Sequence, residues 1–134
     1  MPEPSSFDIN LVIIIPSYNR HDKLLRTLTS LESQWSVHRP FKILVIDNKS
    51  SPSLKTFLSN SKFNGFAFTE VVENQGNVGL GANLLMGIVH GKGDWMWLLG
   101  DDDLPYFDSV ERIYDEIAKS EESCFMLKFN STAG

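Results

Sequence analysis

Short apolar runs alternate with amphipathic segments along the chain, and this alternation predicts strands that alternate with helices. Continuous apolar runs, typical of buried strands, occupy residues 11–15, 43–46, 95–99 and 124–127, and the last predicts a strand at 124–129. A less regular run predicts one more strand at residues 66–72. Apolar stripes at helical spacing or capping signals predict helices near residues 21–35, 52–60, 79–90 and 108–119. Because such strands pair in parallel, we expect a layered α/β domain over residues 10–134, after a polar tail at 1–9.

Local signals predict where these elements begin and end. Pro16 should end the first strand, because a proline nitrogen cannot donate to a sheet ladder. Asn19 is a candidate N-cap for the first helix. Ser51 and Pro52 are candidates for the N-cap and first helical residue of the second.

The carboxyl ends of parallel strands meet at one edge of a sheet, where open α/β sheets bind ligands. Polar groups follow four of the predicted strands, at residues 16–20, 47–48, 73–77 and 101–103. The last group is three adjacent aspartates. Their mutual repulsion raises their pKa values or draws in a hard cation such as Mg²⁺ or Mn²⁺. An acidic turn before a helix is also an ordinary capping and solvated feature, so position alone favours neither interpretation.

Other residues at this edge have a functional and an ordinary interpretation. Asp47 could accept hydrogen bonds from a nucleobase or a ribose, or it could hold the turn before Ser51, and the sequence leaves both open. Tyr18 could stack on a base or simply pack. Arg20 could offset phosphate charge or be a solvated arginine at a helix start. Asn83, in mid-helix, is mildly unfavourable there, which slightly favours a functional contact.

Composition excludes several classes of protein. The 134 residues suit one domain, and the net charge of −5 without a basic block argues against nucleic-acid binding. Cys124 is the only cysteine, in an apolar run typical of a buried thiol, and the three histidines lack zinc spacing. No apolar run is long enough to span a membrane. We therefore expect a cytoplasmic protein, with peripheral attachment to the inner face of the membrane as a further option.

Four segments together resemble family 2 glycosyltransferases of the GT-A fold, a Rossmann-like, mostly parallel sheet with helices on both faces. They are residues 12–20, 44–50, 73–87 and 97–103, in the family's order and near its spacing. Known dinucleotide, P-loop and hydrolase glycine motifs are absent. The resemblance covers residues 10 to 110.

The resemblance implies a nucleotide-diphospho-sugar donor and a Mn²⁺ or Mg²⁺ cofactor. The donor would contact Pro16, Ser17, Tyr18, Arg20, Asp47, Asn48, Asn77, Gly79, Asn83, Asp101 and Asp102. Aligned with the family, Gly100 replaces the first acidic residue, and the metal ligands are Asp102 and Asp103. Simple strand alternation would instead place Asp101 and Asp103 on one side.

The resemblance also implies inverting transfer of a sugar to a hydroxyl on a glycan or lipid-linked acceptor, by analogy in bacterial surface polysaccharide assembly. In the family, an acceptor-binding half follows the fifth strand and supplies the catalytic base. The sequence stops at Gly134, where we expect it to be truncated, and we identify no base in it. The alternatives are a nucleotide-binding module without catalysis and a nucleotidyltransferase, although residues 16–20 lack the latter's glycine- and lysine-rich loop. An uncovered sheet edge would favour self-association.

Overall fold

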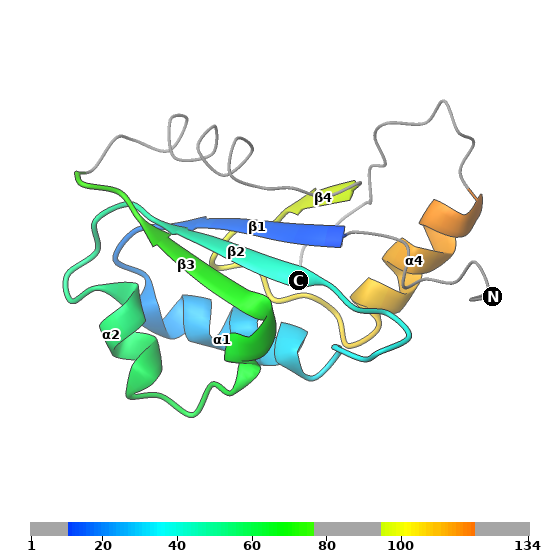
Figure 1. The fold of residues 1–134 in the computed structure, drawn as a ribbon, viewed down its shortest axis with the longest axis horizontal. Helices are drawn as coiled ribbons and strands as arrows, with labels where there is room; N and C mark the ends of the chain where they lie inside the picture. Colours follow the sequence, from blue (N-terminus) through cyan, green and yellow to red (C-terminus); the bar gives the residue numbers. More distant parts are fainter. Residues whose placement is uncertain (1–10, 77–94, 120–134) are drawn as a thin grey trace.

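A parallel sheet forms the centre of the computed structural model, which describes residues 11–76 and 95–119 (Figure 1). Its strands are β1 (Leu11–Ser17), β2 (Lys42–Asp47), β3 (Thr69–Glu73) and β4 (Trp95–Leu98). They lie in the order β3-β2-β1-β4, and every neighbouring pair is parallel. The predicted parallel α/β sheet is confirmed. The expected helix at 79–90, the strand at 124–129 and the tail at 1–9 fall outside the described residues.

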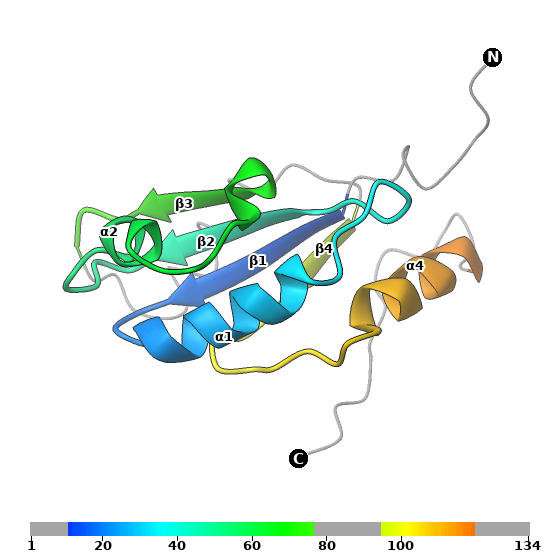
Figure 2. The same ribbon diagram turned by 90° about the horizontal axis from the view of Figure 1, so that it is seen from below.

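Helices α1 (His21–Glu32) and α2 (Leu54–Ser59) lie on the same side of the sheet (Figure 2). The apolar stripe of α1 is fully buried against the sheet at Leu24, Leu28 and Leu31. A further helix of the described residues, α4 (Ser109–Lys119), adds Val110 and Ile113 to the same core. In the described part of the chain, no helix is long and apolar enough to cross a membrane.

Strand β1 lies between β2 and β4, and its side chains are buried on both faces of the sheet by two separate apolar clusters. Ile13 and Ile15 face the core shared with the helices, and Ile14 belongs to a smaller cluster on the opposite face. Burying an isoleucine contributes about 1.5–3 kcal/mol, so this strand is a major source of stability. The end of β1 is therefore held rigidly in the middle of the carboxyl edge, where it presents Ser17.

Pro16 does not end β1, which continues in register to Ser17 opposite Asp47. The direction of the hydrogen bonds gives the reason. Residues of a strand between two parallel neighbours turn their polar groups to each neighbour alternately. The Ser17 carbonyl accepts from Asn48 on the β2 side, and the Ile14 carbonyl accepts from Leu99 on the β4 side. The Pro16 nitrogen therefore points to the β4 side, beyond the last pair of β1 and β4, where no donor is needed.

Two predicted caps are wrong. Asn19 does not cap α1, because its backbone N–H donates to Ser50 Oγ at 2.9 Å and its side-chain oxygen accepts from the Ser51 N–H at 3.0 Å. The N-cap position of α1 belongs to Arg20, which makes no side-chain cap hydrogen bond. Helix α2 is capped by Ser53 rather than Ser51, since Ser53 Oγ accepts the Thr56 N–H at 3.2 Å.

The strand predicted at residues 66–72 begins later, at Thr69, because a 3₁₀ turn (η2, Gly65–Phe68) precedes it. A Cβ at Gly65 would lie 2.6 Å from the ring of Phe63 and 2.8 Å from that of Phe68, so a larger residue would require these rings to shift. Phe63 and Phe68 pack into or against the core, whereas Phe66 is 48% exposed. Phe68 stacks on Trp35 with 5.3 Å between ring centroids. The aromatic residues at 66 and 68 therefore resembled part of a strand in the sequence, although they belong to a 3₁₀ turn.

Candidate functional site

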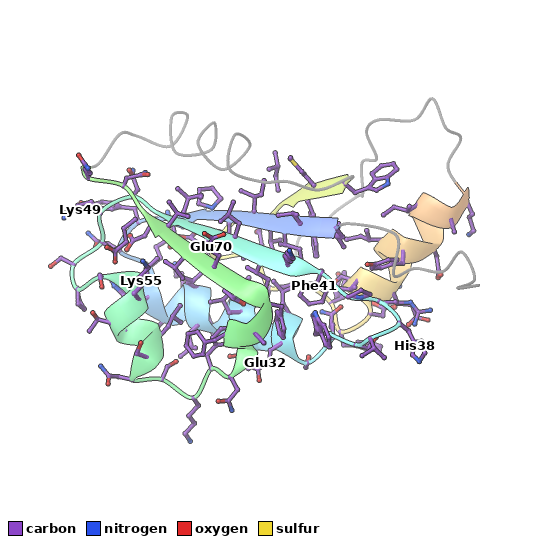
Figure 3. The ribbon with its side chains drawn as sticks, in the orientation of Figure 1. Glu32, His38, Phe41, Lys49, Lys55 and Glu70 are labelled. Atoms are coloured by element: carbon purple, nitrogen blue, oxygen red, sulfur yellow. The ribbon has the colours of Figure 1, made fainter. Side chains whose placement is uncertain are left out.

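The loops after the strands are drawn together at the carboxyl edge of the sheet. The Asn48 N–H donates to the Ser17 carbonyl at 2.9 Å, and the Asn74 N–H donates to the Asp47 carbonyl at 2.8 Å. Each ladder therefore continues one residue into the loops. Figure 3 shows Lys49 at this end of the molecule, while His38 and Phe41 lie at the other. The sequence analysis did not single out Lys49, an exposed cation in a left-handed backbone conformation with φ of 69°.

Asp47 holds the turn between β2 and α2. It is 1% exposed. One carboxylate oxygen accepts the Ser50 N–H at 2.8 Å, and the other accepts the Leu54 N–H at 3.0 Å. These are strong charge-assisted hydrogen bonds that fix the loop carrying Asn48 and Lys49. Of the two interpretations left open by the sequence, the structure displays the turn, and the nucleoside contact stays a prediction.

Asn48 and Asn74 connect two neighbouring loops. Both side chains are buried, and Asn74 Nδ2 donates to Asn48 Oδ1 at 3.2 Å. If Asn48 contacts the sugar donor as predicted, it does so while its side chain is buried and hydrogen-bonded to Asn74. The remaining predicted residues of this region, Asn77, Gly79 and Asn83, lie outside the described part of the chain.

Asp101 is the inward-facing member of the acidic triplet. Its side chain is 10% exposed, and Ser17 Oγ donates to Asp101 Oδ2 at 2.9 Å. Arg20 Nη1 lies 3.6 Å from the other carboxylate oxygen. The structure thus joins the end of β1 to the triplet after β4, as the sequence predicted for the sheet edge.

Asp102 and Asp103 lie in a turn rather than in a strand. The Asp103 N–H donates to the Gly100 carbonyl at 3.2 Å, so residues 100–103 are not extended. Strand alternation therefore does not decide which carboxylates share a side. Asp102 is 47% exposed at its side chain and accepts from Arg20 Nη1 at 3.0 Å. Asp103 folds back so that one carboxylate oxygen accepts the Gly100 N–H at 3.2 Å.

Gly100 makes this folded-back position of Asp103 possible. A Cβ at residue 100 would lie 2.7 Å from the Asp103 carboxylate oxygen. Gly100 stands where the resemblance leads us to expect the first acidic residue. A side chain there would push the Asp103 carboxylate away, so this departure from the family pattern has a structural consequence.

The donor set suits a hard divalent cation shared with a ligand. No group of three histidine, cysteine, aspartate or glutamate side chains within residues 11–76 and 95–119 is placed to hold a metal ion. Magnesium, however, is commonly bound by one or two carboxylates together with substrate phosphates. Asp102 and Asp103 are exposed carboxylates of this kind. The Arg20 guanidinium lies 3.0 Å from a carboxylate oxygen of Asp102, so a positive charge lies beside this carboxylate.

Burial raises the pKa of Asp101 above its ordinary value of 3.8, and the nearby Asp102 raises it further. The Ser17 hydroxyl, Arg20 and the Tyr18 backbone oppose this rise. Between pH 3.8 and the higher native pKa, the folded chain binds more protons than the unfolded chain. The contribution of Asp101 to stability is therefore present at low pH and is lost as the pH rises through that window.

We expect a carboxyl ¹³C titration by NMR to give Asp101 a midpoint above 3.8, and Arg20→Gln should raise it further because the guanidinium charge is removed. The Arg112→Gln variant is the control, since Arg112 pairs with Asp108 instead. A midpoint below 3.8 would contradict the burial of Asp101.

Thr27, which the sequence did not point to, contacts the backbone of the acidic triplet. Its side chain is buried in α1, and its hydroxyl lies 3.1 Å from the Asp101 carbonyl and 2.7 Å from the Asp103 carbonyl. Further along α1, Ser30 Oγ donates to the Pro105 carbonyl, and in the turn after α1 Gln34 Nε2 donates to the Tyr106 carbonyl. Side chains of α1 and of the turn after it therefore position the backbone of residues 101–106. A threonine within a helical apolar stripe gives little sign of this contact in the sequence.

Thr27→Val should lower the free energy of unfolding by about 1–3 kcal/mol, because it removes the one O–H that the Asp101 and Asp103 carbonyls share. Thr27→Ser retains the hydroxyl and should recover most of this loss. Thr29→Val changes an exposed residue of the same helix and should fall within about 0.5 kcal/mol of the parent. Denaturant unfolding of the three variants measures this, and equal stability of Thr27→Val and the parent would refute the contact.

Tyr18 and Arg20 are the predicted edge residues most available to a ligand, together with Asp102 and Asp103. Tyr18 is 44% exposed, and the Arg20 side chain is 49% exposed. Pro16 is half-buried within β1, and Ser17 is buried beneath Asp101. The edge thus has a fixed inner layer and an exposed outer layer.

A groove of about 920 Å³ lies elsewhere, between α1 and α2. Leu25, Phe57 and Leu104 are among its lining residues. None of the predicted site residues lines it, and its surface is mainly apolar. A site for a charged donor is therefore better placed at the carboxyl edge, where the acids and arginine gather.

Comparison with known proteins agrees with this geometry. Residues 12–132 match the family described as Glycosyl transferase family 2. The chain is 27% identical over 104 residues to the poly(ribitol-phosphate) beta-N-acetylglucosaminyltransferase TarP of Staphylococcus aureus, covering 77% of this chain and 31% of that protein.

Two solved structures share the fold. The crystal structure of S. aureus TarS 1-349 in complex with UDP-GlcNAc matches with a TM-score of 0.70 and 19% identity, over 83% of this chain and 32% of that one. The mannosyltransferase PcManGT from Pyrobaculum calidifontis, in complex with GDP-Man and Mn²⁺, matches with a TM-score of 0.60 and 18% identity, over 79% and 32%. The chain thus spans about a third of the length of these proteins. Because the family match extends over most of its residues, the chain belongs to glycosyltransferase family 2.

Proposed function

We propose that this chain forms the donor-binding part of an enzyme that transfers a sugar from a nucleotide-diphospho-sugar to a hydroxyl acceptor. The observation that carries the proposal is the joining of Ser17, Arg20 and the acidic triplet at the carboxyl edge of a family 2 sheet. Two solved structures with this fold are complexes with UDP-GlcNAc and with GDP-Man, which supports the same class of donor here.

In this proposal the outer layer of the edge holds the donor. Tyr18 offers an exposed aromatic face for the nucleobase, and Arg20 offers a planar guanidinium to the diphosphate. Asp102 and Asp103 hold a Mn²⁺ or Mg²⁺ ion, whose bound form would supply Lewis-acid stabilisation of the charge developing on the diphosphate. The Mn²⁺ in the PcManGT complex supports a divalent ion.

The inner layer keeps the outer layer in place. Asp47 fixes the loop after β2, and Ser17 fixes Asp101. Such buried, hydrogen-bonded supports reduce the reorganisation that donor binding would otherwise require. We therefore propose that the inner residues act mainly by positioning the exposed residues of the outer layer. A nucleoside contact of Asp47 would use the carboxylate lone pairs that the turn leaves available.

The proposed transfer is a direct displacement with inversion. The acceptor hydroxyl oxygen attacks the anomeric carbon, the bond from that carbon to the diphosphate oxygen breaks, and a base takes the hydroxyl proton. We assign no residue of the described part to that base. A glycan or lipid-linked acceptor is proposed, supported by the poly(ribitol-phosphate) named for the relative TarP. The proposed setting is cytoplasmic, with peripheral attachment to the membrane.

Titration calorimetry with UDP, GDP and dTDP tests the donor class. We expect at least one of them to bind about tenfold or more tightly with Mn²⁺ than without it, because the cation offsets repulsion between the diphosphate and the triplet. The Asp108→Ala variant is the control. Asp108 directly precedes α4 and pairs with Arg112, so this variant should bind the nucleotides like the parent. Absence of metal-dependent binding for all three nucleotides would contradict the proposal.

A second part of the proposal concerns self-association. Met96 and Leu98 of β4 are 39% and 48% exposed, and Phe107 is 86% exposed. Exposed apolar side chains of this kind favour association. Light scattering at increasing concentration measures it, and a monomer throughout would contradict it.

A further inference from the structure

Arg20 already lies where a metal-bound donor would bring positive charge. Its Nη1 is 3.0 Å from Asp102 and 3.6 Å from Asp101. A divalent ion at Asp102 and the Arg20 guanidinium would repel each other at such distances, since two unit charges 4 Å apart interact by about 4 kcal/mol near a protein surface. Both cannot stay on the same carboxylate.

The arginine is attached to a fixed backbone. The preceding residue, Asn19, is fixed through hydrogen bonds with Ser50 and Ser51 at 2.9 and 3.0 Å. On the following side, the Arg20 carbonyl accepts the Leu24 N–H at 2.8 Å. The side chain, in contrast, is 49% exposed. The backbone of Arg20 is therefore fixed, while its guanidinium group has room to change position.

The ion pair that holds this arm is weak enough to exchange. Asp102 and Arg20 are both about half exposed at their side chains. Such surface ion pairs contribute about 0.2–1 kcal/mol. Within residues 11–76 and 95–119, the ion pairs of Arg20 use Nη1, so Nε and Nη2 are available for a planar, two-pronged contact with phosphate oxygens.

We propose that Arg20 is an exchangeable occupant of the cation position, which leaves Asp102 when a divalent ion binds there and turns to the diphosphate of the donor. Arg20 thereby couples the two binding events. In the free chain it competes with the metal ion, and in the loaded chain it adds to nucleotide affinity. By thermodynamic reciprocity, nucleotide binding then strengthens metal binding by the same factor. This inference rests on the proposed metal position at Asp102 and Asp103.

The exchange predicts opposite effects of one substitution. In Arg20→Gln, affinity for Mn²⁺ alone should rise by about twofold to fivefold, because a weak competing ion pair is removed. Affinity for UDP at saturating Mn²⁺ should fall by about tenfold or more, because a charged hydrogen-bond donor is lost. A residue that only contacts phosphate would change the second affinity and not the first.

The test measures free Mn²⁺ by electron paramagnetic resonance and UDP binding by calorimetry, on the full chain. Arg112→Gln is the matched control, because it removes the same charge and also breaks a 3.0 Å arginine–aspartate pair, in α4. Both affinities of this control should equal those of the parent. Circular dichroism confirms that each variant is folded.

The outcomes separate the two levels of the proposal. If the parent binds neither Mn²⁺ nor UDP, the proposed function and the exchange both fall. If the parent binds both, but Arg20→Gln binds Mn²⁺ no more tightly or UDP no more weakly, the exchange is wrong while the function stands. An equal gain in Mn²⁺ affinity in Arg112→Gln would reduce the effect to net charge and would also overturn the exchange.

Discussion

Removing the carboxylates of Asp102 and Asp103 together should weaken Mn²⁺-dependent nucleotide binding by about 100-fold or more. Loss of even the outer partners of a metal site commonly costs 10- to 100-fold in metal affinity, and these two residues are the proposed ligands themselves. Both side chains are exposed, and they lose only a surface ion pair with Arg20 and a hydrogen bond from the Gly100 N–H. The double alanine variant should therefore keep its fold, with a stability loss of about 0.5–1.5 kcal/mol per site.

The double variant Asp108→Ala/Asp115→Ala is the control for this prediction. It removes the same two negative charges from the start and the exposed face of α4, which Figure 2 shows at the end of the sheet away from the strand arrowheads. Calorimetry with UDP and Mn²⁺ compares the two double variants with the parent. Equal losses in both would mean that general charge, rather than a site at residues 102 and 103, controls binding.

Asp47→Ala should lower the free energy of unfolding by about 3–5 kcal/mol. The substitution leaves the Ser50 and Leu54 N–H groups without the carboxylate that accepts them at 2.8 and 3.0 Å. Hydrogen bonds to a charged group contribute about 1.5–3 kcal/mol each. Because small domains are stable by only about 5–15 kcal/mol, this loss is a large share of the total.

A graded series separates the turn from general burial. Asn at position 47 keeps one carbonyl oxygen as an acceptor, so Asp47→Asn should lose about half as much stability as Asp47→Ala. The exposed Asp115→Ala should change stability by no more than about 0.5 kcal/mol. Urea unfolding measures all three. A stable Asp47→Ala chain would show that the turn does not depend on the carboxylate.

The order of the elements was predictable because apolar runs such as Leu11–Ile15 and the stripe of α1 are set by burial, which the sequence displays directly. The ends of elements were less predictable, because tertiary contacts decide them. Pro16 stays in β1 because of the direction of its nitrogen beside β4. Asn19 links two loops instead of capping a helix, since Ser50 and Ser51 lie beside it in the fold.

The site shows the same division. The gathering of Ser17, Arg20 and the triplet follows from parallel strands, whose carboxyl ends share an edge. The different environments of the three aspartates do not follow, because they depend on a turn that buries Asp101 and exposes Asp102. Thr27 was missed for a related reason, since its partners are backbone carbonyls 74 and 76 residues away.

Paramagnetic broadening by Mn²⁺ tests most directly whether metal and nucleotide meet at this edge. In a ¹⁵N-labelled chain with UDP present, we predict that substoichiometric Mn²⁺ broadens the amide signals of residues 17–20 and 100–103. The signals of α4, residues 109–119, should persist, and Asp102→Ala/Asp103→Ala should abolish the effect. Broadening centred on the groove between α1 and α2, or none in the presence of UDP, would contradict the proposed site.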